Sequence, residues 1–235
     1  MDQLAKNGGA PSAVRVTNCA AALGRAVAEH AIALLLGLLR GIHLAERDRA
    51  AAQWRRETFR NALASLDGAR LAVVGFGTIG RHVANLASAF GADVSIVRRA
   101  AGNGAGNFPV LPLEVAIGQA DAVVIAVPLS PETYQLLNDR RIALLRPHCR
   151  LVNVSRGGII DTQALLAALQ EGRLHSGALD VFEEEPLAAE SALWHLPNVI
   201  LTPHIAGDGN AKTAQRVAEI CLKNYLDIAA STAPG

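Results

Sequence analysis

The sequence is short of aromatic side chains, of cysteine and of net charge. Aromatic residues make up 4% of its 235 residues, and 22 basic side chains nearly balance 21 acidic ones, for a formal charge of +1. Without an excess of positive charge, a nucleic-acid partner is not expected. The chain is instead 51% hydrophobic, far from the composition of a disordered protein. Small and branched aliphatic residues dominate, as in helices packed on a buried parallel sheet.

The cysteines are few and widely separated. Cys19, Cys149 and Cys221 are odd in number, and no two of them have a CxxC or similar spacing. Neither a disulfide framework nor a zinc site is therefore favoured. We expect no metal site, and the pattern fits a reducing cytoplasm.

Long apolar runs are also scarce. The most apolar run, 31–39, is far shorter than the ~20 residues of a membrane-spanning helix. The first residues show no basic segment followed by an apolar one, so the sequence predicts no signal peptide. We therefore expect no membrane partner and a cytoplasmic location.

What the chain does contain is an alternation of helices and short apolar strands. A nearly apolar helical pattern covers 23–47, and a charged amphipathic stretch follows at 50–66. Further helices are expected up to about residue 90, at 161–171 and at 212–230. Strands are expected at 71–74, 94–97, 121–127, 150–154, 177–181 and 199–201. This alternation is typical of βαβ units and predicts an α/β fold with a Rossmann-type, doubly wound parallel sheet.

A GxGxxG pattern lies between the first of these strands and the helix that follows it. There Gly75 allows a tight turn, Gly77 lets backbone amides approach a pyrophosphate, and Gly80 lets the helix pack closely on the strand. The helix N-terminus adds the positive end of its dipole. Thr78 and Ile79 complete this predicted cofactor-binding turn. A glycine-rich turn without a ligand is the alternative.

The end of the next strand indicates which dinucleotide is bound. NAD sites place an acidic residue ~20 positions after the glycines, where it accepts hydrogen bonds from ribose hydroxyls. This sequence has Arg98 and Arg99 there instead. Two guanidinium groups suit a 2′-phosphate, so NADP(H) is the favoured cofactor and NAD is possible. Two solvated arginines on a surface loop are the alternative.

Three more segments extend the pattern: LVNVSRGG at 151–158, GALDVFEEEP at 177–186 and LPNVILTPHIAG at 196–207. With the glycine-rich turn, they make the chain resemble the D-isomer-specific 2-hydroxyacid dehydrogenases over about 16–230. Within that family, the chain looks most similar to the NADPH-dependent glyoxylate/hydroxypyruvate reductase branch. The resemblance implies hydride transfer to a small 2-keto acid substrate, and a homodimer formed through the apolar helix.

The same resemblance assigns catalytic roles to Arg156, Glu185 and His204. In such a reduction a histidine gives a proton to the developing alkoxide. A carboxylate beside the histidine favours the imidazolium, and an arginine pairs with the carboxylate of the substrate. Asp180 is implied to hold the nicotinamide carboxamide. The complete set of cofactor candidates added by the resemblance is Val154, Asp180 and Gly207.

Each catalytic candidate has a simpler alternative. His204 could satisfy backbone groups in a turn, Glu185 could belong to a solvated run of glutamates, and Arg156 could cap a strand end. Trp54 and Trp194 are predicted to be core or interface anchors rather than substrate contacts. The remaining histidines are predicted to be structural or surface residues: His30, His43, His82, His148, His175 and His195.

Members of the family begin with a substrate domain, whereas only some twenty residues precede the apolar helix here. The resemblance therefore implies a remnant of that domain at 1–22, a dinucleotide-binding domain at 23–206, and a C-terminal helix at 207–235 that returns to the substrate domain. Met1 is then either an internal methionine or the edge of a fragment. A dinucleotide-binding module without turnover, or an inactive fragment, is the alternative function.

Overall fold

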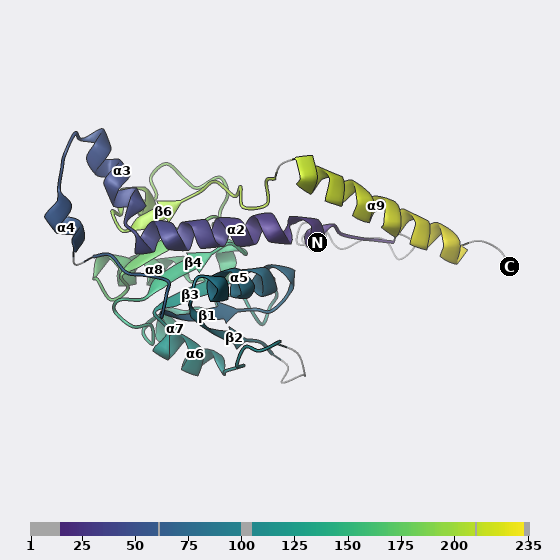
Figure 1. Ribbon diagram of the computed structural model, residues 1–235, viewed down its shortest axis with the longest axis horizontal. Helices are drawn as coiled ribbons and strands as arrows, with labels where there is room; N and C mark the ends of the chain where they lie inside the picture. The colour runs from purple at the N-terminus through teal and green to yellow at the C-terminus, as the bar shows by residue number, and fades with distance from the viewer. Residues whose placement is uncertain (1–14, 61, 100–104, 210, 233–235) are drawn as a thin grey trace.

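A parallel sheet of six strands organises the described part of the chain, with the strand order β2-β1-β3-β4-β5-β6 (Figure 1). The computed structural model describes residues 15–60, 62–99, 105–209 and 211–232. Each strand lies where the sequence predicts one, within a few residues at either end, and the doubly wound α/β fold is confirmed. The strands are β1 (Arg70–Val74), β2 (Asp93–Val97), β3 (Ala122–Ile125), β4 (Arg150–Asn153), β5 (Ser176–Leu179) and β6 (Val199–Leu201).

Helices cover both faces of the sheet. One face carries α2 (Ala20–Leu39) and α5 (Thr78–Ala89). The other face carries α6 (Leu113–Gln119), α7 (Asp139–Ile142) and α8 (Thr162–Gln170). Two short 3-10 helices lie in loops, at Gly157–Ile159 and Ala192–His195.

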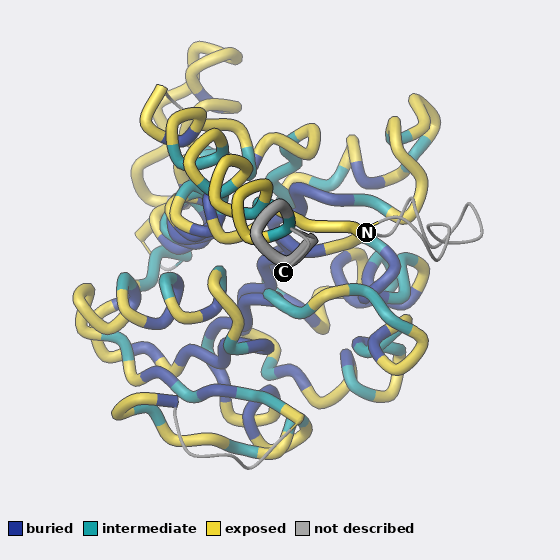
Figure 2. Tube along the Cα trace, turned by 90° about the vertical axis from the view of Figure 1, so that its right-hand side faces the viewer, coloured by how far each residue is buried: buried dark blue, intermediate teal, exposed yellow. Residues whose placement is uncertain are grey.

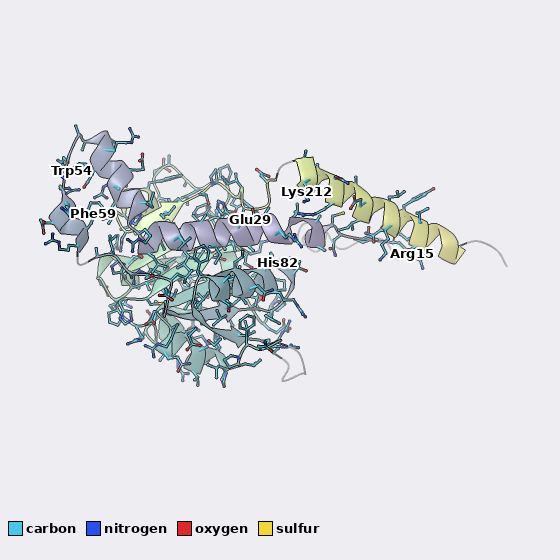
Figure 3. All side chains as sticks on the ribbon, in the orientation of Figure 1. Arg15, Glu29, Trp54, Phe59, His82 and Lys212 are labelled. Carbon is cyan, nitrogen blue, oxygen red and sulfur yellow. The ribbon has the colours of Figure 1, made fainter. Side chains whose placement is uncertain are left out.

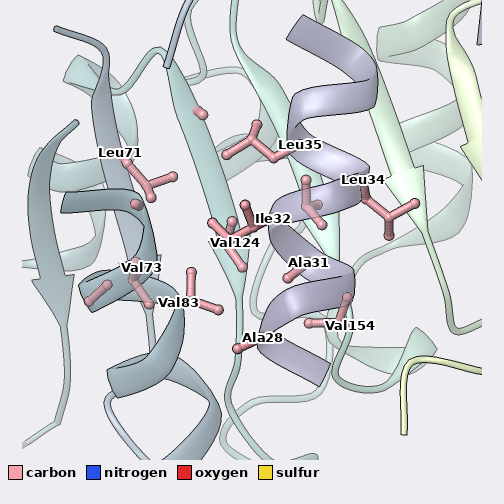
Figure 4. Packing of buried hydrophobic residues seen from close by; sticks show 14 of the residues in the cluster. Ala28, Ala31, Ile32, Leu34, Leu35, Leu71, Val73, Val83, Val124 and Val154 are labelled. Carbon is pink, nitrogen blue, oxygen red and sulfur yellow. The ribbon is translucent and has the colours of Figure 1, made fainter. Parts of the chain in front are cut away.

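Alternate side chains of the strands point to opposite faces of the sheet and pack into a hydrophobic core on each face. In β1, Leu71 and Val73 point toward α2 and α5, whereas Val74 points to the opposite face. All three are at most 1% exposed. Figure 4 shows Leu35 of α2 in the same cluster as Val124 of β3. Burial on both faces explains why the strands read as continuous apolar runs.

The prediction of a single helix at 23–47 is wrong, because the chain turns at Gly41. Gly41 has φ +64°, a left-handed conformation that glycine adopts without strain. The turn separates α2 from α3 (Ile42–Ala50). After α3, the described part of the amphipathic stretch at 50–66 holds the short helix α4 (Arg56–Arg60). Figure 1 shows α3 and α4 projecting as an arm from one end of α2.

Helix α2 is longer than its most apolar run indicates. With 20 residues, it is long and apolar enough by composition to cross a membrane. In this structure, however, its apolar side is buried against the sheet and α5. Core packing therefore accounts for the composition of α2, as for the central helix of many soluble domains.

Helix α9 (Ala211–Thr232) extends beyond the sheet and packs along the start of α2 (Figure 1). Figure 2 shows the helix that leads to the C-terminus coloured largely as exposed. Several of its apolar side chains are exposed, among them Leu222, Tyr225 and Leu226. Its predicted return to a substrate domain stays a prediction. Most of the predicted remnant at 1–22 lies outside the described residues, and within that range α2 already begins at Ala20.

Candidate active site

The glycine-rich turn lies at the point where the strand order of the sheet reverses. Strand β1 lies between β2 and β3, and such a switch point opens a crevice at the carboxyl edge of the sheet. Gly75 leaves β1 with φ +105°, and its N–H donates to the carbonyl of Val97 at 2.8 Å. A Cβ at Gly75 would overlap the carbonyl oxygen of Ala126. Only glycine can make this turn between the two neighbouring strands.

Gly80 and Gly77 have opposite surroundings. A Cβ at Gly80 would overlap the carbonyl oxygen of Gly75, so this glycine lets α5 pack against the turn. A Cβ at Gly77 would meet nothing within 4 Å. Gly77 is also the N-cap residue of α5 and has no side chain to cap the first amides of the helix. Open space beside uncapped helix amides fits the pyrophosphate of a dinucleotide.

The other cofactor candidates surround this turn in different ways. Thr78 is exposed, whereas Ile79 packs against the core. Val154 is 5% exposed and its side chain lies in the core, which leaves only its backbone to contact a ligand. Gly207 is half-buried next to Leu23 of α2.

The two arginines follow β2 and therefore lie beside the glycine-rich turn. Arg98 is half-buried and Arg99 is exposed. A guanidinium nitrogen of Arg99 lies 3.7 Å from Glu132 Oε2, and the same carboxylate accepts a hydrogen bond from Ser130 Oγ at 2.6 Å. That hydrogen bond, aided by the charge of Arg99, lowers the pKa of Glu132. The positive charge at the end of β2 is thus partly balanced by a nearby carboxylate.

His204 and Glu185 form a hydrogen-bonded pair at the same edge of the sheet. His204 Nδ1 lies 2.7 Å from Glu185 Oε2, and the backbone N–H of Phe182 donates to Glu185 Oε1 at 2.9 Å. An ionised Glu185 accepts a hydrogen bond from the N–H of Nδ1, so the outer ring nitrogen, Nε2, is left for a substrate. The alternative interpretation, a histidine that only satisfies backbone groups in a turn, is correct about the turn, since His204 has φ +56°. It does not account for the ring, which is hydrogen-bonded to Glu185.

Several opposing effects set the ionisation of Glu185. Partial burial would raise its pKa, but the hydrogen bonds from His204 and from the Phe182 N–H outweigh that effect. The charges of His204 and Arg156 lower the pKa further. The net result is a pKa below the ordinary value for glutamate, so Glu185 stays ionised at neutral pH.

Arg156 comes close to this pair because two loops pack directly on each other. A Cβ at Gly157 would overlap the backbone of Phe182, so the loop after β4 lies against the loop that carries Glu185. Arg156 itself is exposed, and one of its guanidinium nitrogens donates to the carbonyl of Ser155 at 2.7 Å. The structure thus brings all three catalytic candidates to one edge of the sheet.

Asp180 follows β5, and its buried carboxylate holds the loop after β6 that carries His204. The side chain of Asp180 is 1% exposed. Its Oδ1 accepts hydrogen bonds from Thr202 Oγ1 at 2.6 Å and from the N–H of Ile205 at 3.0 Å, and its Oδ2 accepts one from the N–H of Ala206 at 2.9 Å. These contacts fix the turn around His204. The role predicted for Asp180, contact with the nicotinamide, stays a prediction.

His30 joins this network from α2, which the sequence alone did not indicate. Its Nε2 lies 3.0 Å from Thr202 Oγ1 and 3.4 Å from Asp180 Oδ1. The two residues that His30 contacts lie 150 or more positions further along the chain. A structural role for His30 is consistent with these contacts, but its place beside the candidate active site depends on tertiary packing.

An apolar cavity of about 720 Å³ opens beside the histidine and glutamate pair. Trp194 is part of its wall, and its Nε1–H donates to the carbonyl of Ala188 at 2.9 Å, which orients the indole. Trp194 is 52% exposed and so is not a core residue, whereas its predicted role as an interface anchor stays a prediction. Trp54 is 93% exposed and not a core residue. The cavity is lined by Phe182, Glu185, Pro186, Leu187, Trp194, Leu201, Thr202, Pro203 and His204.

Metal ligands are a separate matter. Among the described residues, no group of three or more histidine, cysteine, aspartate or glutamate side chains is placed to hold a metal ion.

Known proteins of one dehydrogenase family are similar to this chain in sequence. The family described as D-isomer specific 2-hydroxyacid dehydrogenase, NAD binding domain, matches residues 32–206. A glyoxylate reductase from Pyrococcus furiosus is 36% identical over 221 residues, which are 91% of this chain and 65% of the relative. The chain thus spans about two thirds of the length of that relative.

Solved structures of similar proteins show the same fold. A D-isomer specific 2-hydroxyacid dehydrogenase from Xanthobacter autotrophicus, in complex with NADPH and MES, is 28% identical with a TM-score of 0.80, over 95% of this chain and 90% of its own. An NAD-dependent formate dehydrogenase from Staphylococcus aureus, in complex with NAD, is 27% identical with a TM-score of 0.80, over 91% of this chain and 64% of its own.

Proposed function

This chain belongs to the D-isomer specific 2-hydroxyacid dehydrogenase family, and from that premise we propose that it reduces a small 2-keto acid with NADPH. The substrate class is that of glyoxylate or hydroxypyruvate, and the product is the 2-hydroxy acid. The observation that carries the proposal is the 2.7 Å contact between His204 and Glu185, with Arg156 beside it. The name of the Pyrococcus furiosus relative, glyoxylate reductase, supports the substrate class.

Each of the three side chains has a distinct task in this reaction. The cofactor, when bound, supplies a hydride to the carbonyl carbon of the substrate. Protonated His204 donates the proton on Nε2 to the carbonyl oxygen as that oxygen gains charge. The carboxylate of Glu185 stabilises the imidazolium, and it fixes the orientation of the ring by accepting a hydrogen bond from Nδ1–H. Arg156 binds the carboxylate of the substrate and orients its carbonyl group.

The preference for NADPH rests on Arg98 and Arg99 at the end of β2. Charge-assisted bonds from guanidinium groups suit a 2′-phosphate, and the Xanthobacter relative is described with NADPH. If both arginines are only solvated surface charges, NAD serves equally well, as the description of the family domain allows.

The solvent exposure of the catalytic candidates affects the expected turnover rate. The side chain of His204 is 45% exposed and that of Glu185 is 35% exposed. In water, charge-assisted bonds to the substrate are weak, and the keto acid is poorly held for hydride transfer. We therefore expect this chain to bind the dinucleotide but to turn over slowly, well below the 1–1000 per second that is typical of enzymes.

The test is an assay of NADPH consumption with glyoxylate and with hydroxypyruvate, using the wild-type chain and the variant His204→Ala. The wild type should show slow turnover, and the variant should lose about two to four orders of magnitude of it. Dinucleotide affinity should stay within a few-fold, because His204 is not part of the phosphate cradle. Turnover that is unchanged in the variant would remove His204 from the mechanism.

A homodimer is part of the proposal, but the apolar side of α2, the predicted dimer contact, is buried against the sheet and α5, so we place the contact on the arm instead. The arm formed by α3 and α4 carries Trp54, which is 93% exposed, and Figure 3 shows Trp54 and Phe59 at the far end of the molecule from Lys212. An exposed aromatic side chain such as that of Trp54 favours protein–protein contacts. Sedimentation of the wild type and of Trp54→Ala tests this: the wild type should be dimeric and the variant less so.

A further inference from the structure

Two cysteines that are distant in the sequence meet in the structure. The sulfur atoms of Cys19 and Cys221 lie 3.3 Å apart, although 202 residues separate them. Cys19 is the N-cap residue of α2, and Cys221 lies within α9. Both are free thiols; Cys19 is half-buried and Cys221 is exposed. The third cysteine, Cys149, is fully buried immediately before β4.

We propose that Cys19 and Cys221 are a site of reversible oxidation, where a disulfide fastens α9 to the start of α2. A disulfide bond is about 2.0 Å long, so the two sulfur atoms need to approach each other by little more than about 1 Å from their 3.3 Å separation. This distance separates the pair from cysteines that are merely on the same surface. The fold itself provides the approach, because α9 packs along α2.

The oxidant in this proposal is a hydroperoxide, such as hydrogen peroxide. The Cys221 thiolate attacks the O–O bond, forms a sulfenic acid and releases water after proton uptake. The Cys19 sulfur, having lost its proton, then attacks the Cys221 sulfur. The S–S bond forms, the S–OH bond breaks, and the departing hydroxide takes up the proton as water. Two thiols lose two electrons in total, and a dithiol reductant reverses the change.

The surroundings of the three thiols make the reaction selective. Cys221 is exposed and meets the oxidant first. A hydrogen bond with Cys221 raises the pKa of Cys19, so Cys19 keeps its proton until the sulfenic acid has formed beside it. Burial raises the pKa of Cys149 to about 12, and a thiol that is both buried and protonated is inert. Two of the three cysteines should therefore react, and they should react with each other.

The linkage would change the freedom of α9. This helix begins a few residues after the loop that carries His204 and extends beyond the sheet, with α2 as its main support (Figure 1). Trypsin cleaves after basic residues, and α9 offers Lys212, Arg216 and Lys223. A disulfide at Cys221 should slow cleavage in the helix. It should also hold on the chain the C-terminal part produced by cleavage after Lys212 or Arg216, because that part contains Cys221.

The experiment treats the purified protein with hydrogen peroxide, removes the excess, and counts thiols after denaturation. The count should fall from three to one, and peptide mapping without reductant should find Cys19 joined to Cys221 within one chain. Dithiothreitol should restore all three thiols. Limited trypsin digestion, before and after oxidation, should show slower loss of α9 in the oxidised protein.

Three single variants provide the controls. Cys149→Ser should still lose two thiols, because the buried cysteine takes no part. Cys19→Ser and Cys221→Ser should form no link within the chain, and trypsin sensitivity of α9 should not respond to oxidation. Three surviving thiols in the oxidised wild type would overturn the proposal. So would a disulfide that forms only between two chains, or one that involves Cys149.

Discussion

Replacing Gly77 by alanine tests the phosphate cradle directly, because the structure separates its effect on folding from its effect on binding. The added Cβ would meet nothing within 4 Å, and Gly77 has φ −76° and ψ −161°, which alanine can adopt. Alanine lowers the conformational entropy of the unfolded chain, which stabilises the folded state by ~0.4–1 kcal/mol. Alanine is a poorer N-cap than glycine by a similar amount. The free energy of unfolding should therefore change by less than ~1 kcal/mol.

Binding should respond much more strongly. The methyl group would occupy the open space beside the first amides of α5, where the pyrophosphate is expected. We expect Gly77→Ala to weaken NADPH and NADH alike by at least tenfold, or ~1.4 kcal/mol, because both dinucleotides share the pyrophosphate. Fluorescence titration of the reduced nicotinamide measures the affinities, and urea unfolding measures the stability.

Two other glycines serve as controls. Gly80→Ala would place its Cβ against the carbonyl oxygen of Gly75, so it should cost ~1–3 kcal/mol or more of stability. Gly118 lies within α6 with its nearest atom 3.8 Å from an added Cβ, so Gly118→Ala should leave binding unchanged and stabilise by up to ~1 kcal/mol. If Gly77→Ala folds normally and binds both dinucleotides as the wild type does, the pyrophosphate does not lie in this turn.

The remaining predictions concern charge. Arg98→Asp should remove an expected preference for NADPH of at least tenfold and leave NADH binding within a few-fold; equal affinities of the wild type for both would show that the arginines play no part. Glu132→Gln should tighten NADPH binding modestly, because it releases Arg99 from the carboxylate 3.7 Å away; tighter NADH binding to the same extent would contradict this. Burial would raise the pKa of Asp121, but hydrogen bonds from the Arg70 N–H and from His148, with the charge of Arg70, hold it below the ordinary value. A carboxyl group with a lowered pKa stabilises the fold above its unfolded pKa of about 3.9, so this contribution is lost as the pH falls from there through the folded pKa. Urea unfolding should show a shallower acid decline for Asp121→Asn than for the wild type, and parallel declines would refute the reasoning.

The strands and the glycine-rich turn could be predicted because their signals are local. Apolar runs such as 71–74 are buried on both faces, so their composition alone marks them. The functions of Gly75 and Gly80 depend on a turn of six residues. The break at Gly41 is equally local, yet a single glycine inside a helical pattern is usually tolerated. Its left-handed conformation becomes evident only from the way the chain turns into α3.

Contacts across the fold could not be predicted in the same way. The family resemblance assigned roles to His204 and Glu185, but their spacing of 19 residues does not by itself predict a hydrogen bond. His30 reaches Asp180 over 150 positions, and Trp194 reaches the cavity because its indole is tied to Ala188. Each of these contacts depends on where parallel strands end along one edge of the sheet.

The carboxyl edge of the sheet also explains why the candidate site combines a buried, fixed support with exposed reactive side chains. Asp180 is buried and fixes the backbone around His204 through three hydrogen bonds, so the position of the imidazole does not depend on its own packing. The ring can then remain 45% exposed and still point in a defined direction, because Glu185 holds Nδ1. An exposed acid on a buried support can meet a substrate that arrives from outside the sheet. Loss of Asp180 should therefore disturb the orientation of His204 before it disturbs the sheet itself.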